Sequence, residues 1–294
     1  MYMKTKILVC GLMISLFVVG CSKKDNTEDD KFTSQEIAMN AKLDIANEDV
    51  QQLAETEFDA TIANGSNAKM AETALNSQSL LPACAVITRV PAFGTLPTVG
   101  QLVTKTINFG TVGCPMPNGN VLKGKIIISF TFNPTATTHI ITYQFDGFYH
   151  NAIKFNGNKT FTRTLTAATA NMAPHPIVTM DINMTATFPN GNIATRVGTR
   201  TREIIEGFTT ATPLDNIWKI TGAWTTTFQN TTTQTCTITT PLIVKFTCPF
   251  VVKGVVTFVR NSNSAVLDYG NGDCNNQATI AINGGAAVAI TLGN

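Results

Sequence analysis

Histidine is the side chain best suited to acid–base chemistry near neutral pH, and this chain has three: His139, His150 and His175. A Ser-His-Asp triad is assembled in space, so any such triad here would take its base from these three. The sequence contains no Gly-x-Ser-x-Gly motif, and no two of the histidines have metal-ligand spacing on one element. A hydrolase therefore stays an alternative, but no residue is predicted to be catalytic.

A second candidate site is a basic strip on one predicted strand. Arg196, Arg200 and Arg202 are separated by even numbers of residues, so their side chains project from the same face of a strand. This arginine strip has three possible roles. We expect a solvated strand face; the alternatives are that the strip binds an anion or an acidic glycan, or that it docks the acidic N-terminal helix, which the opposite charges of the two parts of the chain favour.

Asp268 and Asp273 flank a Tyr-Gly-Asn-Gly turn. Carboxylate oxygens are the ligands that calcium prefers, but an Asp before Gly is also typical of a side chain that stabilises its own turn. The corresponding positions of a similar segment upstream are Asn108 and Gly113, which favours the turn. We predict no metal and no cofactor.

The cysteines are spaced for disulfides rather than for zinc, because no C-x2-C pair occurs. Residues 107–114 align without gaps on residues 267–274: each segment reads apolar, Asn or Asp, aromatic, Gly, three residues, Cys. Each copy also follows another cysteine. Sequence alone cannot fix connectivity, but this repeat favours Cys84–Cys114 and Cys248–Cys274, leaving Cys236 as a buried free thiol.

The N-terminus has the order of a secretory signal. Lys4 and Lys6 precede an apolar run over residues 7–19, which is too short to span a membrane, and small Gly20 precedes Cys21. Residues 18–21, Val-Val-Gly-Cys, resemble the lipobox of bacterial lipoproteins. The resemblance implies that the peptide is cut before Cys21 and that Cys21 carries the lipid that anchors the chain to a membrane.

Residues 22–30 are polar and charged, which is typical of a solvated tether. Their Lys-then-acidic order is similar to the signal that exports Bacteroidota lipoproteins to the cell surface, and a plain flexible linker is the alternative. We therefore expect a lipid-anchored protein of the outer membrane, and surface exposure follows if residues 22–30 act as the export signal. An oxidising envelope would also permit the disulfides.

Charge divides the mature chain into two parts. Residues 22–75 carry 12 acidic and 5 basic residues, a net charge of −7, whereas residues 76–294 carry 7 acidic and 14 basic residues, a net charge of +7. Opposite charges should hold the N-terminal segment near the rest. The mature chain has no basic excess overall, so we expect no nucleic-acid partner.

The sequence predicts four segments: a signal peptide (1–20), the lipidated Cys21 with its tether (21–33), a helical segment (34–82) and an antiparallel β domain (83–294). Thr33-x-x-Glu36 is a capping-box pattern, and apolar residues at helical spacing predict a helix over about 34–57, with a shorter one over 69–81. We expect the acidic face of the first helix to be solvated, and a partner surface is the alternative.

Beyond Cys84 the chain alternates apolar and polar residues between Asn-Gly turns, a pattern typical of hairpins with one buried face. The fold class predicted is mainly β, a large antiparallel meander preceded by an α-helix. The meander would form either a sandwich or a strongly curved, barrel-like sheet.

The repeat with Cys114 and Cys274, together with residues 198–202 and 239–245, resembles a group of uncharacterised Bacteroidota lipoproteins. The resemblance covers most of the β domain and implies no activity, and Cys236 departs from it. We therefore expect a non-catalytic binding or interaction protein with a glycan or protein partner. A surface glycan-binding lipoprotein and an envelope hydrolase are the alternatives.

Overall fold

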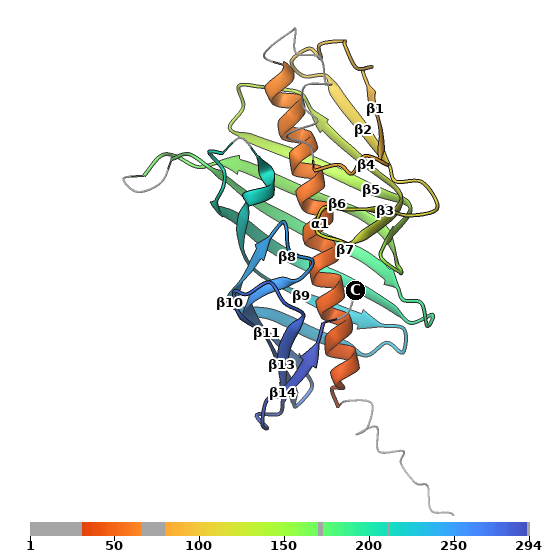
Figure 1. The fold of residues 1–294 in the computed structure, drawn as a ribbon, viewed down its shortest axis with the longest axis vertical. Coiled ribbons are helices and arrows are strands. Elements are labelled where there is room, and N and C mark those ends of the chain that lie inside the picture. Colours follow the sequence, from red (N-terminus) through yellow and green to blue (C-terminus); the bar gives the residue numbers. More distant parts are fainter. Residues whose placement is uncertain (1–30, 66–79, 170–172, 211, 293–294) are drawn as a thin grey trace, which may run out of the picture.

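One long helix lies across one face of a single large sheet in the computed structural model, which describes residues 31–65, 80–169, 173–210 and 212–292 (Figure 1). The predicted fold class, a mainly β antiparallel meander preceded by an α-helix, is confirmed. Within the described residues there is one sheet, so the meander is the curved sheet and not a sandwich.

The elements and their bounds are as follows: α1 Ser34–Gly65, β1 Val86–Val90, β2 Leu102–Asn108, β3 Cys114–Pro115, β4 Val121–Thr131, β5 Thr138–His150, β6 Ile153–Leu165, β7 Pro176–Thr187, β8 Ile193–Glu206, the 3₁₀ helix η2 Pro213–Asp215, β9 Ile217–Phe228, β10 Thr233–Lys245, β11 Val251–Arg260, β12 Asn263–Asn271, β13 Gln277–Ile282 and β14 Val288–Thr291.

The strands follow one another across the sheet in sequence order, except that the short β3 pairs only with β4. Every pair is antiparallel, as Asn-Gly turns between alternating segments predict. In the described chain, β1 and β14 form the two ends of the sheet and do not pair with each other, so the sheet is open.

Glycines allow neighbouring strands to approach closely at the centre of the sheet. Gly222 of β9 has a φ of +140°, and a Cβ built there would lie 2.4 Å from the carbonyl oxygen of Thr199. Gly198 of β8 is equally close to Trp224, which it pairs with in register. Glycines inside strands mark such close contacts, so these residues allow β8 and β9 to approach each other.

α1 is buried around most of its circumference. Every residue from Leu43 to Glu55 is buried, polar and apolar residues alike. A helix that is buried on all sides is usually apolar on all sides, but this one carries acids throughout. The expectation of a solvated acidic face is therefore wrong: the sheet covers the acids and supplies the charges that balance them.

Two apolar clusters form the core, and α1 contributes to both. Leu53 and Phe58 pack in the cluster built mainly on β2–β7, whereas Ile37 and Ile45 pack in the cluster built mainly on β9–β13. The helix therefore joins the two halves of the sheet.

The helix begins at Ser34 as predicted and extends beyond the predicted end at residue 57 to Gly65. The backbone N–H of Glu36 donates to Oγ1 of Thr33 (3.1 Å), which forms one half of the capping box. The Glu36 carboxylate instead accepts hydrogen bonds from Arg260. The second helix predicted over 69–81 lies largely outside the described residues, and its last two residues are not helical.

Candidate ligand-binding site

The arginine strip on β8 faces α1, and its first two members meet one carboxylate there. Nη1 of Arg196 donates to Oδ1 of Asp44 (2.7 Å) and Nη2 of Arg200 donates to the same oxygen (2.5 Å). The hydroxyl of Tyr269 donates to Oδ2 of Asp44 (2.8 Å). Nη1 of Arg200 also donates to Glu48 (3.2 Å). Asp44 is thus enclosed by donors from two strands.

The third arginine continues the contact along the helix. Nη2 of Arg202 donates to Oε1 of Gln52 (2.5 Å), and its guanidinium lies 3.6 Å from carboxylate oxygens of both Glu48 and Glu55. Its guanidinium carbon also lies 3.7 Å from the ring centroid of Trp218. An arginine held between carboxylates and an aromatic face is well placed for cation–π attraction.

These contacts decide between the three roles considered for the strip. The side chains of Arg196, Arg200 and Arg202 are 1–4% exposed, so the strip is not a solvated strand face. It docks the acidic helix, as the opposite charges of the two parts of the chain suggest. While α1 is in place, the strip offers no surface to an external anion or glycan.

Burial raises the pKa of each of these acids of α1, but the net shift differs between them because the neighbouring charges differ. Burial alone would raise the pKa of Asp44, but the charges of Arg200 and Arg196 outweigh it and hold that pKa below its usual value. Burial raises the pKa of Glu55, and the more distant Arg202 only partly opposes this. Burial and the Asp44 charge raise the pKa of Tyr269 well above its usual value, so the phenol remains a donor.

Ion pairs with other strands extend over almost the whole helix. Glu36 at its N-terminal end meets Arg260 of β11, and Nζ of Lys105 of β2 lies 2.8 Å from Oε2 of Glu57 near the other end. A buried charge is tolerated when it is paired and hydrogen-bonded. The sheet therefore fixes the helix at several points by charge as well as by apolar packing.

Asp49 accepts hydrogen bonds from three side chains on one side of the helix. They are Nε2 of His150 (2.7 Å) and the amides of Asn118 (2.9 Å) and Asn120 (2.7 Å). Asn118 and Asn120 belong to a predicted turn, and both are buried. Their amides therefore connect the helix to the turn before β4, a role that the turn pattern alone does not reveal.

The other two histidines lie elsewhere. Nε2 of His139 is 3.0 Å from the carbonyl oxygen of Ala136, and Nε2 of His175 is 3.1 Å from Glu203. The structure thus places the three histidines in three separate environments, and each contact agrees with a role in local packing.

Both predicted disulfides are present in the structure, Cys84–Cys114 and Cys248–Cys274. Cys236 is buried and free, as expected, and burial raises the pKa of its thiol to about 11. In both copies of the repeat the side chain before the aromatic residue accepts a hydrogen bond from the glycine N–H: Asn108 from Gly110 (2.9 Å) and Asp268 from Gly270 (2.8 Å). These contacts support the turn-stabilising role over calcium binding.

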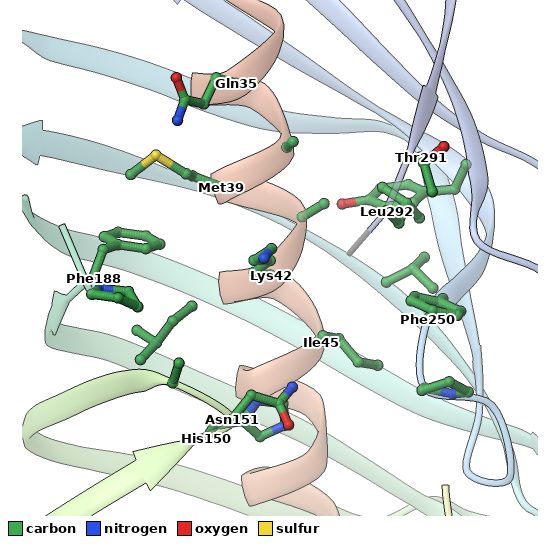
Figure 2. Close-up of a pocket in the computed structure, with 18 of the residues that line it drawn as sticks. Gln35, Met39, Lys42, Ile45, His150, Asn151, Phe188, Phe250, Thr291 and Leu292 are labelled. Carbon is green, nitrogen blue, oxygen red and sulfur yellow. The ribbon is translucent and has the colours of Figure 1, made fainter. Parts of the chain in front are cut away.

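A cavity of 410 Å³ opens over the N-terminal half of α1, and we call it the helix cavity. Met39, Lys42 and Ile45 of α1 form its floor, and Figure 2 shows Lys42 at the centre of this helix face. Its volume lies within the range of about 300–1,000 Å³ that is typical of small-molecule sites.

The walls of the helix cavity come from segments far apart in the sequence. Phe188, at the end of β7, lies on one side of α1 in Figure 2, and Phe250 and Leu292 lie on the other. His150 and Asn151, at the turn between β5 and β6, line its lower end in this view. Most of the lining residues are apolar, and α1 positions them by holding the sheet in a curve around itself.

The helix cavity has few groups for chemistry. As far as the chain is described, its lining includes Thr291 but neither serine nor cysteine. His150 is 1% exposed and uses Nε2 to contact Asp49. Such an arrangement suits the enclosure of an apolar molecule better than nucleophilic attack on one.

The residues of this site carry no sequence motif, so the sequence alone does not reveal it. The floor appears only as part of a helix, and Phe188, Phe250 and Leu292 appear only as apolar ends of strands or loops. Phe148 is buried, and its ring is stacked on that of Phe145 with the centroids 4.9 Å apart, so it offers no platform for a sugar.

Comparisons of the chain with models of known families, with curated proteins and with solved structures found no match. The described part of the chain has no helix that is both long enough and apolar enough to cross a membrane. Over the same residues, no three His, Cys, Asp or Glu side chains come together where they could hold a metal ion.

Proposed function

We propose that this chain is a lipid-anchored protein of the cell envelope whose folded body binds a small ligand without changing it chemically. The anchor is the lipid on Cys21, as the signal-like N-terminus suggests. The tether of residues 22–30 then leads toward Ser34, where α1 begins. The folded body would then be attached to the membrane through the end of α1 that adjoins the helix cavity.

The observation that carries the binding role is the helix cavity. It is lined by apolar residues from α1, two hairpin ends, the loop before β11 and the chain end. Apolar clefts with a few polar groups are the usual form of a ligand site. Glycan binding, the runner-up, has less support, because the arginine strip is buried under α1 and Phe148 lies in the core.

Occluding the helix cavity tests the binding role. Ala38 is half-buried on α1 and lines the cavity, so Ala38→Trp should fill part of it. Ala60 is also half-buried on α1 but does not line the cavity, so Ala60→Trp is the matched control. We expect Ala38→Trp to abolish binding of the amphipathic fluorescent probe 1-anilinonaphthalene-8-sulfonate, and Ala60→Trp to preserve it. Equal binding by both variants would contradict the proposal, provided that thermal melts show both folded.

Metabolic labelling tests the anchor separately. Cells that express the chain are supplied with an alkyne analogue of palmitate, and the protein is isolated and probed for the label. We expect labelling of the native chain, none of Cys21→Ala, and loss of Cys21→Ala from the membrane fraction. Persistent labelling of Cys21→Ala would show that the anchor lies elsewhere.

A further inference from the structure

An amine and an amide meet in the buried contact between α1 and β6. Nζ of Lys159 on β6 donates to Oδ1 of Asn47 on α1, and each residue is only 2% exposed. The partner of this lysine is thus an uncharged amide, whereas the equally buried Lys105 pairs with the carboxylate of Glu57. The site therefore places a nitrogen nucleophile against a carbonyl group, away from the water that would compete with it.

The surroundings of Lys159 favour its neutral, nucleophilic form. Burial, followed by the charge of Arg200, lowers its pKa to about 7, whereas an ordinary lysine has a pKa of about 10.4. The buried ring of Tyr143 lies 5.7 Å from Nζ and keeps the surroundings of the amine poorly hydrated. A lysine that loses its proton near neutral pH in such a site is an activated nucleophile.

The carboxylate of Glu48 is the third group at this site. Its Oε1 accepts a hydrogen bond from Nδ2 of Asn47 (3.0 Å), and its charge acts on Lys159. Ion pairs with Arg200 and Arg202 hold the carboxylate in place, and in the described part of the chain its buried Oε2 makes no hydrogen bond. Glu48 therefore adjoins the amide nitrogen and has an oxygen available to accept a proton.

We infer that Lys159 and Asn47 form an intramolecular isopeptide bond, a covalent modification that joins β6 to α1. The lone pair of neutral Nζ adds to Cγ of Asn47, and the positive charge of Arg200 favours the negative charge that develops on Oδ1. Glu48 carries one proton from Nζ to Nδ2. The Cγ–Nδ2 bond then breaks and ammonia leaves. An amine and a primary amide thus give a secondary amide and ammonia, so the reaction needs no oxidant or cofactor.

The bond can form only in the folded chain, because its two partners are 112 residues apart in the sequence. It makes the docking of α1 on the sheet covalent, in addition to the ion pairs of the arginine strip. After the reaction Lys159 has no amine that titrates. Any pH dependence of stability that this amine causes therefore belongs to the chain before the bond has formed.

Peptide mass spectrometry of the full chain tests the inference. After denaturation and reduction, trypsin should release residues 43–69 and residues 155–159 as separate peptides from a chain without the bond. The bond blocks cleavage after Lys159. It should therefore yield one branched peptide, in which residues 43–69 are joined to residues 155–163 and the mass is lower than their sum by one ammonia molecule.

Two controls accompany this measurement. Cleavage after the buried Lys105 should be complete, because its ammonium faces a carboxylate, which is a poorer electrophile than an amide. Asn47→Ala should remove the branched peptide and restore cleavage after Lys159. If the native chain gives only the two separate peptides, the inference is wrong, whatever the variants show.

Glu48→Gln tests the role of the carboxylate. The branched peptide is measured at intervals after synthesis of the chain, and we expect the rate of its formation to fall about 100-fold or more, because the proton carrier is lost. Glu57→Gln is the matched control, since it also removes a buried carboxylate of α1 from an ion pair with the sheet. It should leave the rate unchanged. An unchanged rate in a Glu48→Gln variant that thermal melts show to be folded would overturn the role of Glu48.

Discussion

Asp44 forms ion pairs with two arginines at a site that is buried from water. Both guanidinium groups donate to the same carboxylate oxygen, and all three side chains are at most 2% exposed. Removing one partner of a buried ion pair leaves a charge that cannot be rehydrated, which typically costs about 3–5 kcal/mol. The arginines alone therefore do not stabilise the fold, since without the acid they would oppose it.

The substitution Asp44→Asn should accordingly lower the free energy of unfolding by about 3–5 kcal/mol, because it keeps the shape but leaves Arg196 and Arg200 uncompensated. Urea denaturation measures this change. Asp146→Asn is the control, because its ion pair with Lys125 is about half exposed and such pairs contribute about 0–1 kcal/mol. Equal effects of the two substitutions would contradict this account of the interface.

Lys159 is a buried base close to the same cluster. Its ammonium donates to Asn47, and burial, followed by the charge of Arg200, lowers its pKa to about 7. A lysine in the unfolded chain has a pKa of about 10.4. Above pH 7 the unfolded chain therefore binds the proton that the folded chain has released, and stability must rise with pH in this window.

We expect the free energy of unfolding to increase between pH 7 and pH 9, and the increase to be smaller in Lys159→Met. The comparison stops at pH 9 because Cys236, whose pKa is raised from 9.0 to about 11, begins to act in the opposite direction there. Lys253→Met, at an exposed site, should retain the native pH profile. Parallel profiles for the native chain and Lys159→Met would disprove this assignment.

At the scale of the elements, glycines allow β8 and β9 to approach each other closely. Gly222→Ala would place a Cβ 2.4 Å from the Thr199 carbonyl oxygen at a φ of +140°. We expect it to lower the free energy of unfolding by about 3 kcal/mol, from overpacking and backbone strain together.

Gly191→Ala separates these two causes, because Gly191 also has a positive φ, +83°, but a Cβ there meets nothing within 4 Å. This substitution should cost only the strain, about 1–2 kcal/mol. If urea denaturation shows that the two substitutions lower the free energy of unfolding equally, the close approach between β8 and β9 adds nothing to the effect of Gly222→Ala.

Elements with a strong local sequence pattern could be predicted, whereas the contacts between elements were harder to predict. Alternation and Asn-Gly turns predicted the meander, and the repeat around Cys114 and Cys274 predicted both disulfides. The charge division favoured contact between the arginine strip and the acidic helix but left other roles open. Burial of Asn118 and Asn120 and the gathering of Phe188, Phe250 and Leu292 depend on contacts between residues distant in sequence, which local patterns do not encode.

At the scale of the molecule, the two disulfides close loops of 30 and 26 residues. In the chain-entropy model, a loop of this size contributes about 3 kcal/mol to stability. Replacing both cysteines of one disulfide with serine should therefore lower the free energy of unfolding by about 3 kcal/mol for either pair. Reductant opens both disulfides of the native chain and should therefore lower its free energy of unfolding by about 6 kcal/mol in the same model, whereas in a variant that keeps one disulfide it should lower it by about 3 kcal/mol.

The position of α1 has a consequence for the order in which the protein folds. Strands pair with their neighbours in sequence, so the sheet can grow by short loop closures, whereas the contact between Asp44 and Arg196 joins residues 152 apart. Contacts between distant residues form slowly. The helix therefore stays exposed to water until β8 has formed. A wholly apolar helix would be prone to aggregate during that interval. The acidic residues that later pair α1 with the sheet thus also keep the helix soluble before the sheet has formed.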